Sequence, residues 1–148
     1  MMPSSSGDRA WALLFARSVL GLIFLMAGVF KVFQLGVLEH ARRFFVEPYA
    51  DTFLPAWSLW LTGALVPIVE LLAGVLIVIG LFTRPALIAL GLVLVLVTFG
   101  HLLKEPFFEF HTHVIPRLAL VAFILMVPRD ADRFGGDALV HSLRNPRG

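Results

Sequence analysis

The alternation of apolar and polar positions divides the chain into four long apolar stretches joined by polar segments. About 20 apolar residues in a helix cross the hydrocarbon core of a bilayer, and the strands of membrane barrels are far shorter. A helix also satisfies its backbone hydrogen bonds within one segment, as lipid requires. We therefore predict an all-α, integral membrane four-helix bundle, formed as a single domain over residues 1–148, with spans at residues 11–33, 57–82, 85–103 and 107–127.

The segment between the first two spans, residues 36–56, mixes aromatic and charged side chains. Phe44, Phe45 and Tyr49 occur close to Arg42 and Arg43. This mixture is typical of a short helix that lies in the membrane interface. Two roles stay open for it, namely an aromatic anchor belt at the bilayer surface and a lid over a pocket that opens outward.

The distribution of basic residues predicts the orientation in the membrane. The turn at residues 80–85 is tight, so the second and third spans are expected to be antiparallel, with Pro85 in the first turn of the third helix. With four spans, residues 1–10, this turn and the tail over residues 128–148 share one side. Because cytoplasmic loops are enriched in Lys and Arg, we expect both termini to be cytoplasmic. That side carries Arg9, Arg84, Arg129, Arg133, Arg144 and Arg147, whereas on the other side Arg42, Arg43 and Lys104 are offset by acidic residues.

Composition supports the membrane class and excludes several functions. Hydrophobic residues make up 59% of the chain and charged residues 15%, and the mean hydropathy is +0.90, which leaves too few polar residues to cover a soluble domain. A net charge of +2 does not favour nucleic acid as a partner. The absence of cysteine excludes disulfide exchange, thiolate metal sites and iron–sulfur ligation by this chain alone.

Helical spacing places the small and polar residues of each span on one face. Charged side chains in a membrane turn away from lipid, so the four faces should converge on one axis. We expect a polar shaft that opens outward and ends at Glu70, near the midplane of the second span. The aligned residues are Arg17, Gly21, Phe24, Gly28 and Lys31; Gly63, Pro67, Glu70 and Gly74; Gly91, Thr98 and His101; and His113 and Arg117, whereas His111 points elsewhere.

Glu70 is the only charged residue of the second span, and an ionisable group at that depth is costly. In a structural interpretation, Glu70 pairs with Arg117 or Lys31 and locks the bundle, since an unpaired buried carboxylate would become protonated. In a functional interpretation, Glu70 and Lys31 form a proton or charge relay. Together with His101, His113 and Arg117 they would bind a ligand. We expect no metal site, and keep His101 and His113 as haem or copper ligands only as a less favoured alternative.

Three stretches of this chain resemble the DoxX family. They are residues 19–31, residues 69–85 with a Glu followed by Gly-Leu-Phe-Thr-Arg, and the tail over residues 133–139. Lys31, Glu70 and Arg84 match the family pattern. The resemblance implies a four-helix bundle in the bacterial cytoplasmic (inner) membrane. The family is named for the small membrane subunit associated with thiosulfate:quinone oxidoreductase, and its relatives are linked with redox complexes, with assembly and with cargo reception.

Three functional hypotheses follow. In the first, the chain is a quinone-interacting membrane subunit that acts with a protein partner: Lys31, His101 or Arg117 donates hydrogen bonds to the quinone carbonyls, and Glu70 exchanges a proton. Enzymatic activity would then belong to a quinone-linked oxidoreductase complex, since the chain has no cofactor motif of its own. The alternative is a non-catalytic assembly or cargo-binding module in which the polar stripe is structural. The third, proton or solute conduction, would require a homo-oligomer.

Overall fold

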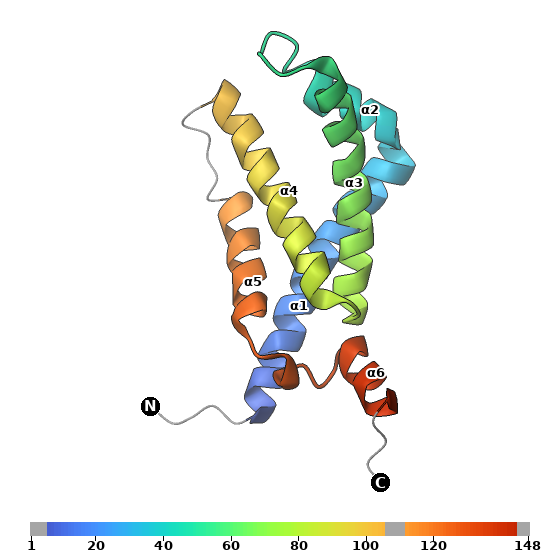
Figure 1. Ribbon diagram of the computed structural model, residues 1–148, viewed down its shortest axis with the longest axis vertical. Helices are drawn as coiled ribbons and strands as arrows, with labels where there is room; N and C mark the ends of the chain where they lie inside the picture. Colours follow the sequence, from blue (N-terminus) through green and yellow to red (C-terminus); the bar gives the residue numbers. More distant parts are fainter. Residues whose placement is uncertain (1–5, 106–111, 145–148) are drawn as a thin grey trace.

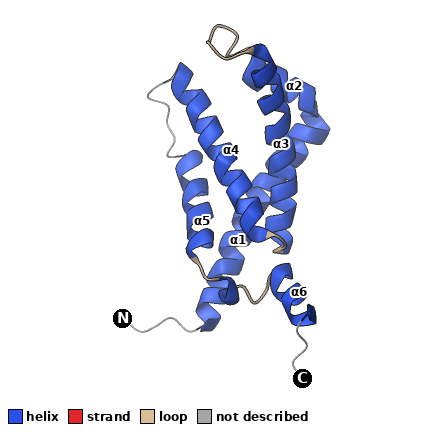
Figure 2. Ribbon diagram, in the orientation of Figure 1, coloured by secondary structure: helices blue, strands red, loops and turns tan. Residues whose placement is uncertain are grey.

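The regular structure of the chain is entirely helical in the parts that the computed structural model describes, residues 6–105 and 112–144 (Figure 2). This confirms the predicted all-α class. In order, the elements are α1 (Ser6–Val29), the π-helical η1 (Phe30–Gly36), α2 (Val37–Ala41), the π-helical η2 (Arg42–Val46), α3 (Ala56–Ile79), α4 (Thr83–Lys104), α5 (Val114–Met126), the 3₁₀-helical η3 (Arg129–Ala131) and α6 (Gly136–Arg144).

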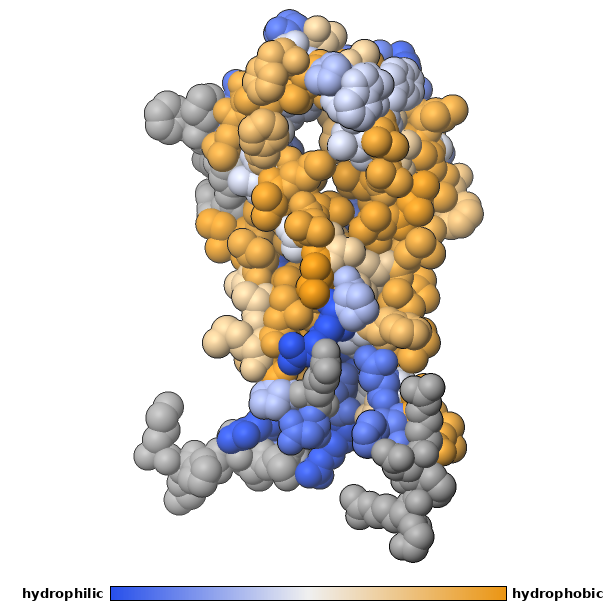
Figure 3. Space-filling model, in the orientation of Figure 1, coloured by the Kyte–Doolittle hydropathy of each residue, from blue (hydrophilic) through white to orange (hydrophobic). Residues whose placement is uncertain are grey.

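Helices α1, α3, α4 and α5 form the predicted four-helix bundle (Figure 1). Among the described residues, three helical stretches are long and apolar enough to cross a membrane, namely residues 7–46, α3 and α4. The fourth helix, α5, has 13 residues, or about 20 Å at 1.5 Å per residue. The fourth span was expected from residue 107, and residues 106–111 lie outside the described residues. Apolar side chains form a broad band between two polar ends (Figure 3), as lipid contact requires.

Glycines let α1 and α3 approach closely. Gly21, Gly28 and Gly74 are buried on the facing sides of the two helices. A Cβ atom added at Gly28 would lie 2.5 Å from the Cα atom of Leu71, and one added at Gly74 would clash with the backbone of Leu25. Small residues at such positions allow close helix packing where lipid provides little hydrophobic driving force. The predicted stripes of α1 and α3 therefore face each other.

The chain beyond α1 continues as a helix but changes direction. The π-helical η1 ends at Gly36, whose φ of +89° is a conformation that glycine adopts without strain. Segment α2–η2 then packs back against α3, where Ala41 lies directly against Gly63. The short helical segment expected within residues 36–56 is thus present, and it rests on the bundle.

The C-terminal segment closes one end of the bundle, which we call the base; α1 begins at this end and α6 lies there (Figure 1). Arg17 of α1 is buried and forms an ion pair with Asp132, with a distance of 2.6 Å between Nη1 and Oδ2. The carboxylate of Asp137 accepts hydrogen bonds from the backbone N–H groups of Phe82 (2.9 Å) and Thr83 (3.2 Å). The tail therefore caps the first turn of α4.

The tightly packed core lies nearer the base than the opposite end. From their tight turn, α3 and α4 diverge toward the opposite end, which we call the open end (Figure 1). The core side chains that pack together include Leu20, Phe24, Ile77, Leu87, Leu90, Val121 and Ile124.

Candidate functional site

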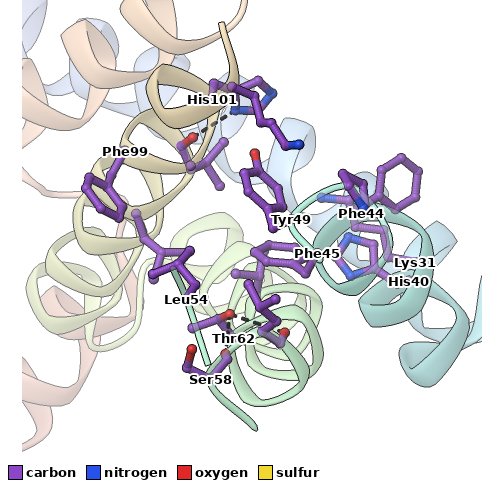
Figure 4. Close-up of a pocket in the computed structure, with 17 residues that line it drawn as sticks. Lys31, His40, Phe44, Phe45, Tyr49, Leu54, Ser58, Thr62, Phe99 and His101 are labelled. Atoms are coloured by element: carbon purple, nitrogen blue, oxygen red, sulfur yellow. Dashed lines mark hydrogen bonds between the residues drawn. The ribbon is translucent and has the colours of Figure 1, made fainter. Parts of the chain in front are cut away.

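A cavity of about 680 Å³ lies at the open end. Its walls come from α3, α4 and the segment from η1 to the loop that precedes α3 (Figure 4). The volume falls in the range of small-molecule sites, which are mostly apolar with a few polar groups. This pocket has that composition: most of its lining is aliphatic or aromatic, and its polar side chains are Lys31, His40, Tyr49, Ser58, Thr62, His101 and Lys104.

Lys31 connects the pocket to Glu70. Its ammonium group is 2.6 Å from Oε2 of Glu70, and the side chains are 26% and 8% exposed, respectively. Lys31 lines the pocket and Glu70 does not, so the carboxyl lies behind the ammonium group. Of the two partners that the sequence left open for Glu70, the structure selects Lys31. Arg117 instead lies over the ring of Phe24, at 5.8 Å from its centroid, in a cation–π contact.

His40 is a pocket residue that the sequence analysis missed. It is 3% exposed, and its Nδ1 lies 2.8 Å from the carbonyl oxygen of Gly63. Because a carbonyl only accepts, Nδ1 must carry the proton, and Nε2 of the neutral ring is then an acceptor. The rings of Phe44 and Phe45 lie 5.2 and 5.7 Å from the imidazole. The first span was predicted to end at residue 33, so its inward face was not followed beyond Lys31 to His40.

The opposite wall carries His101, whose Nδ1 donates to the carbonyl oxygen of Val97 at 2.8 Å. Near it, the Tyr49 side chain packs over Gly100, and burial raises the pKa of the Tyr49 hydroxyl. Lys104, at the end of α4, pairs with Asp51 and lowers the pKa of that carboxyl. These contacts tie residues 47–55 to α4 over the pocket.

Residues 37–55, which we call the covering segment, lie over one side of the pocket, and a lid was one of the two roles left open for residues 36–56. Phe45 and Leu54 line the pocket from this segment. Leu38 and Phe53 are exposed on it, at 70% and 77%, as an anchor in the membrane interface would be. One face of the segment thus covers the pocket and the other is available to the membrane surface.

The structure does not bring the α5 residues of the predicted site to this pocket. His113 is exposed immediately before α5, and neither His113 nor Arg117 lines the cavity. His111 lies outside the described residues. Within residues 6–105 and 112–144, no group of three or more His, Cys, Asp or Glu side chains is placed to hold a metal ion. Of the five expected ligand-binding residues, Lys31 and His101 line the pocket and Glu70 contacts it through Lys31.

The sequence model of the DoxX family matches residues 12–102. This range is more than half of the 148 residues and contains Lys31, His40, Glu70 and His101. No match was found among curated proteins or among solved structures. On the strength of the family match, together with its helical membrane fold, the chain belongs to the DoxX family.

Proposed function

We propose that the pocket binds the headgroup of a membrane quinone, and that the chain is a quinone-interacting subunit that acts with a redox partner. The observation that carries this proposal is the chemistry of the cavity: an apolar, aromatic-lined space at the open end, with a lysine ammonium at its inner side. A ligand that fits it is flat, largely apolar and polar at its oxygen atoms. A quinone has these properties and reaches the site from the bilayer.

Individual contacts support a quinone headgroup. Phe44, Phe45 and Phe99 offer aromatic surfaces to a flat ring. The Lys31 ammonium has three N–H donors. One of them serves Glu70, so another can donate to a quinone carbonyl. A cation close to the reduced oxygen also stabilises the negative charge that develops there.

The Lys31–Glu70 pair also supplies groups that can transfer protons to the ligand. Reduction of a quinone to a hydroquinone consumes two electrons and two protons. In this proposal the electrons come from a protein partner and both protons come finally from water. Lys31 passes one proton to a quinone oxygen, and Glu70 relays a proton taken up from water back to Lys31. The second proton reaches the other quinone oxygen directly from water. The basic residues at the base favour a cytoplasmic location for that end, in a bacterial inner membrane. The pocket would then open to the outer side.

A second candidate function is a non-catalytic assembly or cargo-binding module. The observation that favours it is the group of large apolar side chains exposed on the covering segment, Leu38, Phe44 and Phe53. Exposed apolar patches mark interaction surfaces. In that case the Lys31–Glu70 pair is an internal lock, and the pocket holds a client side chain.

The experiment that tests the quinone proposal is organic extraction of the detergent-purified protein, followed by mass spectrometry for quinones. Thr62→Phe fills the pocket, and Leu61→Phe adds the same ring to the neighbouring exposed position of α3 as a matched control. We expect a near-stoichiometric quinone in the wild type and in Leu61→Phe, and at least tenfold less in Thr62→Phe. Equal, substoichiometric amounts in all three samples would contradict the proposal and favour the assembly module.

A further inference from the structure

The polar atoms of the pocket point to the redox form that it prefers. His40 lines the cavity, and its Nδ1 hydrogen is already donated to Gly63. Among the described residues this is the one hydrogen bond that the ring makes. Nε2 is therefore the polar atom that His40 offers to a ligand, and in the neutral ring it accepts a hydrogen bond.

Other polar groups of the lining also turn their hydrogens away from the cavity. The hydroxyl of Ser58 donates to the carbonyl oxygen of Pro55, and the hydroxyl of Thr62 donates to that of Ser58, each at 2.7 Å. A hydroxyl that has donated its hydrogen still has an oxygen lone pair with which to accept. Between them, His40, Ser58 and Thr62 offer acceptors on the α2 and α3 sides of the pocket (Figure 4).

We propose that His40 accepts a hydrogen bond from a ligand hydroxyl, and that the pocket therefore binds the hydroquinone form in preference to the quinone. This inference rests on the proposed function and specifies the ligand of that site. A hydroquinone carries two O–H donors, whereas a quinone has only carbonyl acceptors. Lys31 can donate to an oxygen of either form, so it does not distinguish them. Nε2 of His40 does distinguish them, because it and a quinone carbonyl are both acceptors and cannot form a hydrogen bond with each other.

The test compares the affinities of the full-length protein for ubiquinol-1 and ubiquinone-1 by anaerobic equilibrium titration in detergent. One hydrogen bond of this kind corresponds to about a tenfold difference in affinity, so we expect ubiquinol-1 to bind about tenfold more tightly. For a two-electron couple, tenfold tighter binding of the reduced form raises the midpoint potential of the bound couple by about 30 mV. Equal affinities, or tighter binding of ubiquinone-1, would overturn the inference.

Two variants of His40 separate the acceptor from the structural hydrogen bond. In His40→Asn the side-chain amide can still donate to Gly63, but nothing replaces Nε2. In His40→Gln the longer amide places an oxygen acceptor nearer the position of Nε2. We expect His40→Asn to lose the preference for ubiquinol-1 and His40→Gln to retain part of it. A preference unchanged in His40→Asn would also overturn the assignment to His40.

The outcomes distinguish this inference from the function on which it rests. If neither compound binds the wild type, the proposed quinone site itself is wrong. If both bind and Thr62→Phe abolishes both, the site stands, and the ratio of their affinities decides the role of His40. Because the wild-type ratio is measured without any substitution, a His40 variant that fails to fold does not remove the test.

Discussion

At the residue scale, the ion pair of Lys31 with Glu70 is the feature that the sequence predicted only in part. The depth of Glu70 in an apolar run made a partner necessary, since burying an unpaired charge is costly. Spacing left Lys31 and Arg117 equivalent, because it places a residue on one face of its own helix and does not fix which residue of another helix it meets. The structure selects Lys31 for Glu70 and places Arg117 over the ring of Phe24.

A double-mutant cycle tests this pair. Lys31→Met leaves the Glu70 carboxyl buried without its cation, and we expect it to lower the free energy of unfolding by about 1–3 kcal/mol, less than for a fully dry pair because Lys31 is partly exposed. Lys31→Met combined with Glu70→Gln should recover most of that loss. The measurement is denaturant unfolding in detergent. If the losses in Lys31→Met and in Glu70→Gln alone added up to the loss in the double variant, the two groups would not interact.

The contact of Asp51 with Lys104 predicts a response to pH. Lys104 holds the pKa of Asp51 in the folded protein below its ordinary value of 3.8. The ion pair therefore stabilises the contact of residues 47–55 with α4 above that pH. It is lost as the pH falls through the lowered pKa. We expect the protection factors for hydrogen exchange in residues 47–55, which are corrected for the intrinsic effect of pH, to fall in acid and to stay constant between pH 5 and pH 7. In Asp51→Asn this acid-dependent step should disappear, and an identical step in both proteins would assign it to another group.

At the element scale, the close approach of α1 and α3 is the part of the fold that the sequence predicted best. Glycines spaced along one face of each stretch leave room for a neighbouring backbone. The structure uses Gly28 and Gly74 in this way, whereas a Cβ atom added at Gly91 of α4 would meet, within the described part of the chain, only Val121, at 3.9 Å. The same residue type in a predicted stripe therefore marks close packing in one helix pair and open space in another, and sequence alone does not separate the two.

This difference supplies a matched pair of substitutions. Gly28→Ala places a methyl group against the α3 backbone, and we expect a loss of about 1–3 kcal/mol in stability from overpacking. Gly91→Ala should be neutral or slightly stabilising, because the new methyl group meets only an ordinary van der Waals contact. Thermal unfolding followed by size-exclusion chromatography measures both. Equal melting temperatures for the two variants would refute the close packing of α1 on α3.

The C-terminal segment is an element whose position the sequence did not predict. Its Arg-Phe-Gly-Gly-Asp motif and the Gly-Leu-Phe-Thr-Arg-Pro turn were recognised separately, and their contact through Asp137 appears only in the structure. Loss of an N-cap costs about 1 kcal/mol, so we expect Asp137→Ala to destabilise the protein by that amount. Asp130→Ala, at an exposed acidic position nearby, is the control. A neutral Asp137→Ala would show that the tail does not cap α4.

At the scale of the whole molecule, the class, the helix number and the shared side of the first and last segments followed from hydropathy and charge. The pocket did not, because it depends on the chain continuing as a helix beyond residue 33 and folding back at Gly36. A helix boundary placed at residue 33 hides His40 among loop residues. The fold was therefore predictable from the pattern of apolar and polar residues. The pocket was not, because its walls depend on the direction that the chain takes after Gly36.

The orientation of the whole molecule is testable because the chain has no cysteine. Ala50→Cys introduces one thiol in the exposed loop at the open end, and Ser142→Cys introduces one on α6 at the base. If the termini are cytoplasmic, a membrane-impermeant maleimide should label Ala50→Cys in intact bacterial cells and Ser142→Cys only after lysis. The reverse pattern would place the pocket on the cytoplasmic side.

The central claim is that a quinone occupies the pocket, and photolabelling with an azidoquinone tests it most directly. After irradiation of the full-length protein, peptide mass spectrometry identifies the labelled residues. We predict label on peptides that carry pocket residues, such as His40, Tyr49 and Phe99, and its loss when excess ubiquinone-1 competes. Label confined to exposed positions of α1, such as Phe15 and Met26, and unaffected by the competitor, would contradict the account.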